Sequence, residues 1–123
     1  MRTETLVLFS DREEEFVNLL VGIGIRKNTA KVLVFLAMHP KATSRAIERG
    51  TDLSQPEVSL VMKALLRDGW IGCSECVGGN RGRPVNVYRL IKPVCEIMDG
   101  IEREKMRQAA DQLEMIRRLR TFV

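Results

Sequence analysis

The sequence predicts an α+β fold that is mostly helical, and three features of the chain carry this prediction. Apolar residues recur at helical spacing in successive segments of residues 11–68. Residues 70–90 contain two short segments of strand character separated by glycines and Pro84, which set a turn and exclude a helix. From Pro93, helical spacing returns over about 27 residues, too many for a helix buried in so small a domain.

The composition favours a partner that carries negative charge. A hydrophobic content of 45% over 123 residues is enough for a core, whereas 5% aromatic residues argue against a platform that stacks single-stranded bases. The formal charge is +4, and its excess lies in residues 26–92, with 12 Lys and Arg against 5 Asp and Glu. We therefore expect a polyanionic partner. A basic face that is merely solvated is the alternative.

The location of the protein also follows from the composition. No stretch approaches the ~20 apolar residues of a membrane span, and residues 1–4 lack a signal-peptide pattern. Three cysteines without a disulfide framework suit a reducing compartment. We expect a cytoplasmic protein without membrane contact.

Two helices are expected at the start of the chain. The first is capped by Ser10 or Asp11, has glutamates in its first turn, and is ended by Gly22 and Gly24. The second begins at a cap on Asn28 and ends at His39-Pro40, because a residue before proline disfavours helical geometry. Apolar residues nearly surround this second helix, which predicts that it forms the centre of the core.

A tight turn joins two further helices. The third helix is expected to begin at Ala42 or Thr43 and to end at a C-cap on Gly50. The fourth begins at Ser54, which forms a Ser-x-x-Glu capping box with Glu57. Leu53 is expected to anchor the turn in the core, and the buried stripe of the fourth helix comprises Val58, Val61 or Met62, Leu65 and Leu66.

Two helices around a tight turn, followed by a glycine-rich hairpin, predict a winged helix-turn-helix over residues 1–92. Helix 55–68 would lie in a DNA major groove, and the wing at residues 76–85 would lie at the adjacent minor groove or phosphates. The outer face of that helix carries Gln55, Pro56, Glu57, Ser59, Leu60 and Lys63. The wing tip adds Asn80, Arg81 and Arg83, and the expected phosphate contacts near the third helix are Lys41, Thr43, Ser44 and Arg45.

Residues 93–123 predict a long dimerisation helix. The spacing 106–109–113–116 is a 3-4-3 apolar seam of the kind found in coiled coils. The alternative is a helix that packs back on its own domain. The expected dimer contacts are Ile97, Ile101, Met106, Ala109, Leu113 and Ile116.

The cysteines and the catalytic inventory give weaker signals. Cys73 and Cys76 form one Cys-x-x-Cys on an expected strand, where positions i and i+3 point to opposite faces. Only a bulge or turn at residues 74–75 would bring both sulfurs onto one metal ion, so no metal or cofactor is predicted. A cysteine-based redox or metal switch, with Cys95 as the third thiol, is an alternative. No residue set favours an enzyme, and residues 78–82 lack the Lys-Ser/Thr and following helix of a nucleotide loop.

The motifs over residues 27–92 resemble a known superfamily. Residues 53–59 and 65–71, Leu-Ser-Gln-Pro-Glu-Val-Ser and Leu-Leu-Arg-Asp-Gly-Trp-Ile, are similar to the helix-turn-helix of MarR- and TrmB-type regulators. The wing residues Gly82-Arg83-Pro84 and Tyr88-Arg89-Leu90 resemble the ending of archaeal TrmB-like repressors. The resemblance implies a homodimeric transcription regulator that binds double-stranded DNA through helix 55–68 and the wing. A winged helix that binds a partner protein is the rival interpretation.

Overall fold

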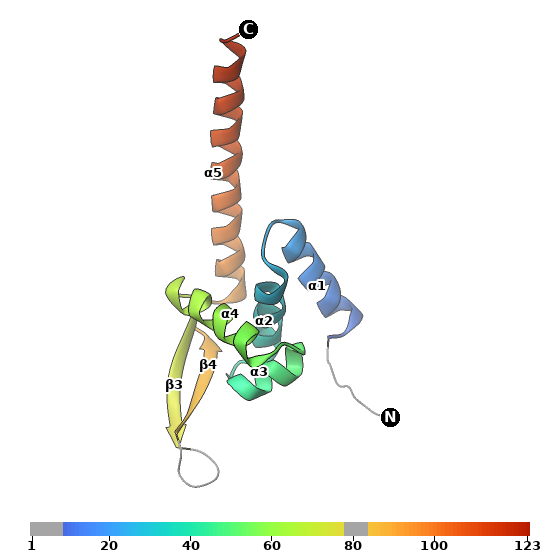
Figure 1. The fold of residues 1–123 in the computed structure, drawn as a ribbon, viewed down its shortest axis with the longest axis vertical. Coiled ribbons are helices and arrows are strands. Elements are labelled where there is room, and N and C mark those ends of the chain that lie inside the picture. The colour runs from blue at the N-terminus through green and yellow to red at the C-terminus, as the bar shows by residue number, and fades with distance from the viewer. Residues whose placement is uncertain (1–8, 78–83) are drawn as a thin grey trace. The chain divides into compact units, whose positions relative to one another are not determined.

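The computed structural model describes residues 9–77 and 84–123, and the chain forms two compact units, Met1–Ile91 and Lys92–Val123. The first unit combines helices with a small antiparallel sheet of three strands in the order β2-β4-β3, and the hairpin of β3 and β4 extends from beside α4 (Figure 1). The second unit is one long helix. The predicted α+β, mostly helical class is confirmed. The elements are α1 (Asp11–Gly22), α2 (Lys27–Met38), β2 (Ala42–Thr43), α3 (Ser44–Thr51), α4 (Gln55–Arg67), β3 (Ile71–Val77), β4 (Pro84–Leu90) and α5 (Val94–Arg120).

Helix α2 is the centre of the core, as its apolar composition predicts. Ala30 and every residue from Val32 to Leu36 are buried. Each such aliphatic side chain contributes about 1.5–3 kcal/mol relative to an exposed one. Leu53, in the turn between α3 and α4, is buried as expected. Helices α1, α3 and α4 bury their apolar faces in the same core, through Val17, Leu20, Ile47, Val58, Val61, Met62 and Leu65. Leu66, expected in this stripe, is instead 40% exposed.

Strand β2 was not expected from the sequence. Ala42 and Thr43 pair with Tyr88 and Val87 of β4, so a helix start at Ala42 is wrong, whereas the alternative start at Thr43 agrees with its place as the N-cap. Helix α3 begins at Ser44, and the Thr43 hydroxyl accepts a hydrogen bond from the Ala46 amide at 3.1 Å. Thr43 therefore ends a strand and caps a helix at once.

The first two helices begin with different kinds of cap. Ser10 and Glu13 form a capping box at the start of α1, with hydrogen bonds of 2.9 and 3.2 Å. The predicted cap at Asn28 is wrong, because α2 begins at Lys27 and its N-cap, Arg26, makes no side-chain hydrogen bond. Asn28 lies instead in the groove that Glu57 of α4 also lines.

Helix α3 continues past the glycine that was expected to end it. Its C-cap is Asp52, whose φ of 59° lies in the left-handed region, so the prediction of Gly50 as C-cap is wrong. Gly50 serves packing instead, because a Cβ built on it would come within 2.0 Å of the Phe35 ring. The same ring stacks on His39 at a centroid distance of 4.3 Å.

Helix α5 spans 27 residues after the N-cap Pro93, close to the predicted extent. Ile97 is buried and Ile101 half-buried, whereas every residue from Glu102 to Val123 is exposed. Side-chain ion pairs link Arg107 with Glu104 and Asp111, and Arg117 with Glu114. Among the helices in the described ranges, none combines the length and apolar character needed to cross a membrane.

Gly50→Ala tests the contact between α3 and α2. We expect a loss of about 1–3 kcal/mol in the free energy of unfolding, because the added methyl group overlaps the buried Phe35 ring. Urea denaturation would measure the loss. Gly22→Ala is the matched control, since its added Cβ meets no atom within 4 Å, and it should leave stability unchanged or slightly higher. Equal stability of the two variants would contradict the packing role of Gly50.

Candidate nucleic-acid interface

Local hydrogen bonds fix the start of α4. The Ser54 amide donates to the Glu57 carboxylate at 2.9 Å, and the Glu57 amide donates to the Ser54 hydroxyl at 3.3 Å. Pro56 lies in the first turn, where its missing N–H costs no hydrogen bond. The predicted capping box is confirmed, and the exposed first turn of α4 has a defined geometry.

The exposed side of α4 is divided between two grooves. The first, which we call the wing-side groove, lies between α3, α4 and β4 and has a volume of about 280 Å³. Gln55, Ser59 and Lys63 line it at spacings of four residues, which places them in one row along α4. The opposite wall consists of Ser44 and Glu48 of α3, with Asn86 and Tyr88 of β4.

The second groove, the α2-side groove, lies between α4 and the start of α2 and has a volume of about 780 Å³. Glu57, Leu60 and Arg67 line it from α4, and Arg26 and Lys27 line it from α2. Lys63 borders both grooves. The six residues predicted for one outer face therefore do not all line one surface, because Glu57 and Leu60 lie in the α2-side groove.

Two residues of the wing-side groove were missed in the sequence. Asn86 and Tyr88 are two positions apart on β4, so both point to the same face of the strand. Asn86 is exposed and Tyr88 half-buried. Period-two alternation in residues 84–90 is the signal that could have found them, but assigning that face to α4 required the tertiary structure.

The predicted phosphate contacts gather at the start of α3. Lys41 and Arg45 are exposed, while Thr43 and Ser44 are half-buried. The predicted tip residues Asn80, Arg81 and Arg83 lie outside the described residues. The strands that lead to the tip are paired from Ile71 with Leu90 to Val77 with Pro84.

The pairing of the wing strands also bears on the cysteines. Cys73 is opposite Tyr88 and Cys76 is opposite Val85, in a ladder that runs without a bulge through Ser74 and Glu75. The backbone geometry that one shared metal ion would need is therefore not present at this pair. Cys73 and Cys95 are exposed free thiols. Within residues 9–77 and 84–123, no group of three His, Cys, Asp or Glu side chains is placed to hold a metal ion.

The Glu57 carboxylate is an electrostatic anchor of α4. Its hydrogen bonds with the Ser54 backbone and side chain are the main cause that holds its pKa below the ordinary value of 4.5, with smaller contributions from Asn28 and Lys31. A carboxylate engaged in this way stabilises the positive end of the helix dipole. Glu57 thus stabilises the start of α4, and this role does not depend on base contact.

The pH dependence of stability tests this role. A lowered folded-state pKa gives stability that is present above the unfolded-state pKa and is lost as the pH falls through the folded-state value. We expect wild type to be more stable than Glu57→Gln at pH 7 and the difference to shrink on acidification, measured by urea denaturation across a pH series. A difference that stays constant or grows toward acid pH would contradict this assignment.

Comparison with known proteins identifies the fold. No protein-family model and no curated protein matches the sequence. The chain is similar to the structure of TrmBL2, an archaeal chromatin protein, at 16% identity and a TM-score of 0.67, over 88% of this chain and 38% of that protein. It is also similar to a possible transcriptional regulator from Methanosarcina mazei, at 16% identity and a TM-score of 0.60, over 82% of this chain and 86% of the other.

A MarR family transcription regulator gives a third match, at 17% identity and a TM-score of 0.54, over 81% of this chain and 64% of the other. The chain thus spans 38% of the length of TrmBL2 but most of the length of the Methanosarcina protein. The predicted TrmB-like and MarR-like winged helix-turn-helix fold is confirmed.

Proposed function

We propose that this chain, which has the fold of TrmB-like and MarR-like regulators, is a double-stranded-DNA-binding transcription regulator that acts as a homodimer. Helix α4 lies in the major groove, and the wing lies at the adjacent minor groove or phosphates. The observation that carries the proposal is the polar row of Gln55, Ser59 and Lys63 in the wing-side groove, beside β4. The TrmBL2 structure, described as showing a novel mode of DNA binding, supports DNA as the partner.

In this proposal, Gln55 and Ser59 of this row contact the bases. The Gln55 amide donates and accepts hydrogen bonds, as does the Ser59 hydroxyl, so both read base edges in the major groove. Leu66, 40% exposed at the far end of the groove, offers an apolar contact for a thymine methyl group. Asn86 of β4 adds a second amide from the wing.

Phosphate contacts flank this row. Lys41 and Arg45 are exposed next to the start of α3, where the first backbone amides of the helix also favour an anion. Thr43 and Ser44 add hydroxyl donors there. On the other side, we assign Asn80, Arg81 and Arg83 to the DNA backbone or the minor groove. Such contacts set orientation and salt dependence and do not read sequence.

Leu60 and Glu57 have smaller roles in this arrangement. Leu60 is 71% exposed but lies in the α2-side groove. The Glu57 carboxylate accepts the Ser54 amide and carries a charge that phosphates repel. We therefore propose that sequence preference depends on the wing-side row and less on these two residues.

Ser59→Ala and Gln55→Ala test this division, with Leu60→Ala as the control on the other side of α4. After selection of bound duplexes from a random pool, the two test variants should lose about 1–3 kcal/mol of binding free energy on the selected site. On random duplex the loss should be below about 0.5 kcal/mol, since phosphate contacts remain. Fluorescence anisotropy titrations at one fixed salt concentration would measure both. Equal losses on both DNAs, or a larger effect of Leu60→Ala, would contradict the assignment.

The homodimer would form through α5. Met106, Leu113 and Ile116 are 66%, 60% and 45% exposed and share the 3-4-3 seam with Ala109. The ion pairs of Arg107 with Glu104 and with Asp111 lie outside this seam, on exposed positions that can stay in contact with solvent. Ile101, half-buried nearer the start of α5, extends the proposed contact, whereas Ile97 is buried within the chain and leaves almost no surface for a partner. Two-fold pairing would set two recognition helices about one DNA turn, ~34 Å, apart.

Leu113→Asp tests the seam, because a carboxylate buried between two apolar helices is costly. We expect the dimer dissociation constant to rise at least about tenfold and the measured mass to approach the 14.0 kDa of one chain. Analytical ultracentrifugation at several concentrations would measure both quantities. Gln108→Asp, an exposed position off the seam, should leave the dimer intact. A dimer that survives Leu113→Asp unchanged would contradict this interface.

The second candidate function is that of a winged helix that binds a partner protein, which would cover Leu60, 71% exposed beside Arg26, Lys63 and Arg67 in the α2-side groove. A winged-helix protein-interaction module would show no mobility shift with any duplex at low salt and would form a stable hetero-complex. Both candidate functions are binding functions, and we propose no enzymatic activity.

A further inference from the structure

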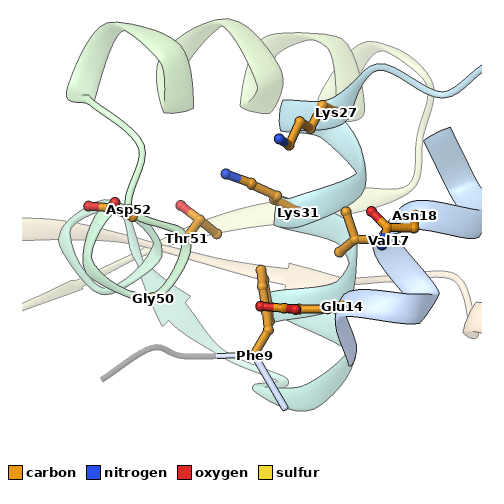
Figure 2. A pocket seen from close by; sticks show the side chains of 9 residues that line it. All are labelled: Phe9, Glu14, Val17, Asn18, Lys27, Lys31, Gly50, Thr51 and Asp52. Carbon is orange, nitrogen blue, oxygen red and sulfur yellow. The ribbon is translucent and has the colours of Figure 1, made fainter. Parts of the chain in front are cut away.

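A cavity of about 380 Å³ lies between α1, α2 and the end of α3 (Figure 2). Its volume is in the range of sites that hold small molecules. None of the residues assigned to DNA contact lines it. Side chains from three helices form its walls, and Phe9, just before α1, closes one side. The cavity therefore needs an explanation other than DNA binding.

The walls of the cavity carry charges of both signs. Lys27 and Lys31 are four residues apart on α2, so their side chains share one face of that helix. Glu14 of α1 and Asp52 at the C-cap of α3 provide carboxylates on the other walls. Within the described part of the chain, no ion pair within 4.0 Å joins these lysines to these carboxylates.

Uncharged groups complete the lining. The hydroxyl of Thr51, which is only 3% exposed, donates to the Ile47 carbonyl at 2.6 Å. Its oxygen therefore keeps acceptor capacity toward the cavity. Asn18 contributes a side-chain amide, and Phe9 and Val17 contribute apolar surface. The cavity thus offers cations, acceptors and an apolar wall within one small volume.

We propose that this cavity binds a small zwitterion of the α-amino acid class and that the bound ligand regulates DNA binding. The ligand carboxylate would pair with Lys27 and Lys31, and its ammonium would pair with Glu14, Asp52 and the Thr51 oxygen. A simple anion would leave the two wall carboxylates facing it, and a simple cation would leave the two lysines. Glu14, Lys27 and Asp52 are exposed and Lys31 is half-buried, so all four are accessible, and a ligand with both charges pairs with all of them.

The regulatory half of this inference rests on the proposed function and follows from two links to α4. Thr51 and Asp52 line the cavity and directly precede Leu53, which is buried in the turn, and Ser54, which caps α4. Lys31 lines the cavity too, and its charge makes a small contribution to lowering the pKa of the Glu57 carboxylate in the first turn of α4. A ligand held here therefore contacts the residues that lead directly into the recognition helix.

Calorimetric titration of the full chain without DNA tests the binding site. L-leucine is the first probe, because its side chain suits an apolar wall of one aromatic and one aliphatic residue. Isopentylamine lacks its carboxylate, and 4-methylpentanoate lacks its ammonium. We expect leucine to bind and each analogue to bind at least about tenfold more weakly, as loss of one charged pairing predicts. No binding of leucine at about 10 mM, or equal affinity for all three probes, would overturn the proposal.

Matched variants locate the bound probe. Lys31→Gln and Glu14→Gln should each weaken leucine binding at least about tenfold, since each leaves one ligand charge unpaired. Lys92→Gln and Glu15→Gln change the same residue types at exposed positions that do not line the cavity, and they should bind leucine as wild type does. Circular dichroism would establish that all four variants fold. Unaltered binding by both cavity variants would overturn the proposed location, and the wild-type probe series stands without any variant.

A DNA titration separates the two halves. Saturating leucine should change the affinity of wild type for its selected duplex at least about threefold, and it should have no effect on Glu14→Gln. Leucine binding without a change in DNA affinity would overturn the regulatory role. Failure of the ligand-free chain to bind duplex DNA would reject the proposed function instead, because the calorimetric test contains no DNA.

Discussion

Burial of α2 is the constraint on which the first unit depends. Its apolar residues cover nearly the whole circumference, so the helix is stable only when other elements cover it on most sides. Helices α1, α3 and α4 each bury an apolar face in that core. Gly50 shows how closely they approach, because no side-chain atom fits between α3 and the Phe35 ring. The orientation of the helix-turn-helix is therefore a consequence of packing.

Within that frame, short-range hydrogen bonds decide where each helix begins. The side-chain oxygens of Ser10, Thr43 and Ser54 each accept a hydrogen bond from the backbone amide three residues ahead. Each of these caps lies just before a helix that packs in the core. Helix α4 receives an additional anchor, because Glu57 returns a hydrogen bond to Ser54. The positive charge of Lys31 on α2 makes a smaller contribution to lowering the pKa of the same carboxylate. The first turn of α4 is thus held by hydrogen bonds within its own segment of the chain.

The two sides of α4 differ in the residues that they expose. Its wing-side row faces β4 and carries hydrogen-bonding groups without large apolar side chains at its start. Its opposite side faces the start of α2, where cations surround the exposed Leu60. The cavity beneath the turn lies next to the residues that fix α4 and apart from those that would read DNA. Under the proposed function, this separation would let a ligand bias the helix without occupying the proposed DNA surface.

The sequence by itself determined the elements whose signals are local: the capping box of α4, the apolar surround of α2, the hairpin and the length of α5. These depend on residues within a few positions of one another. Only the tertiary structure decided that Thr43 pairs with Val87, that Gly50 packs against Phe35, and that Asn86 joins Ser59 in one groove. Each of these joins residues far apart in the chain. Their meeting depends on how the helices cover α2, which no local pattern encodes.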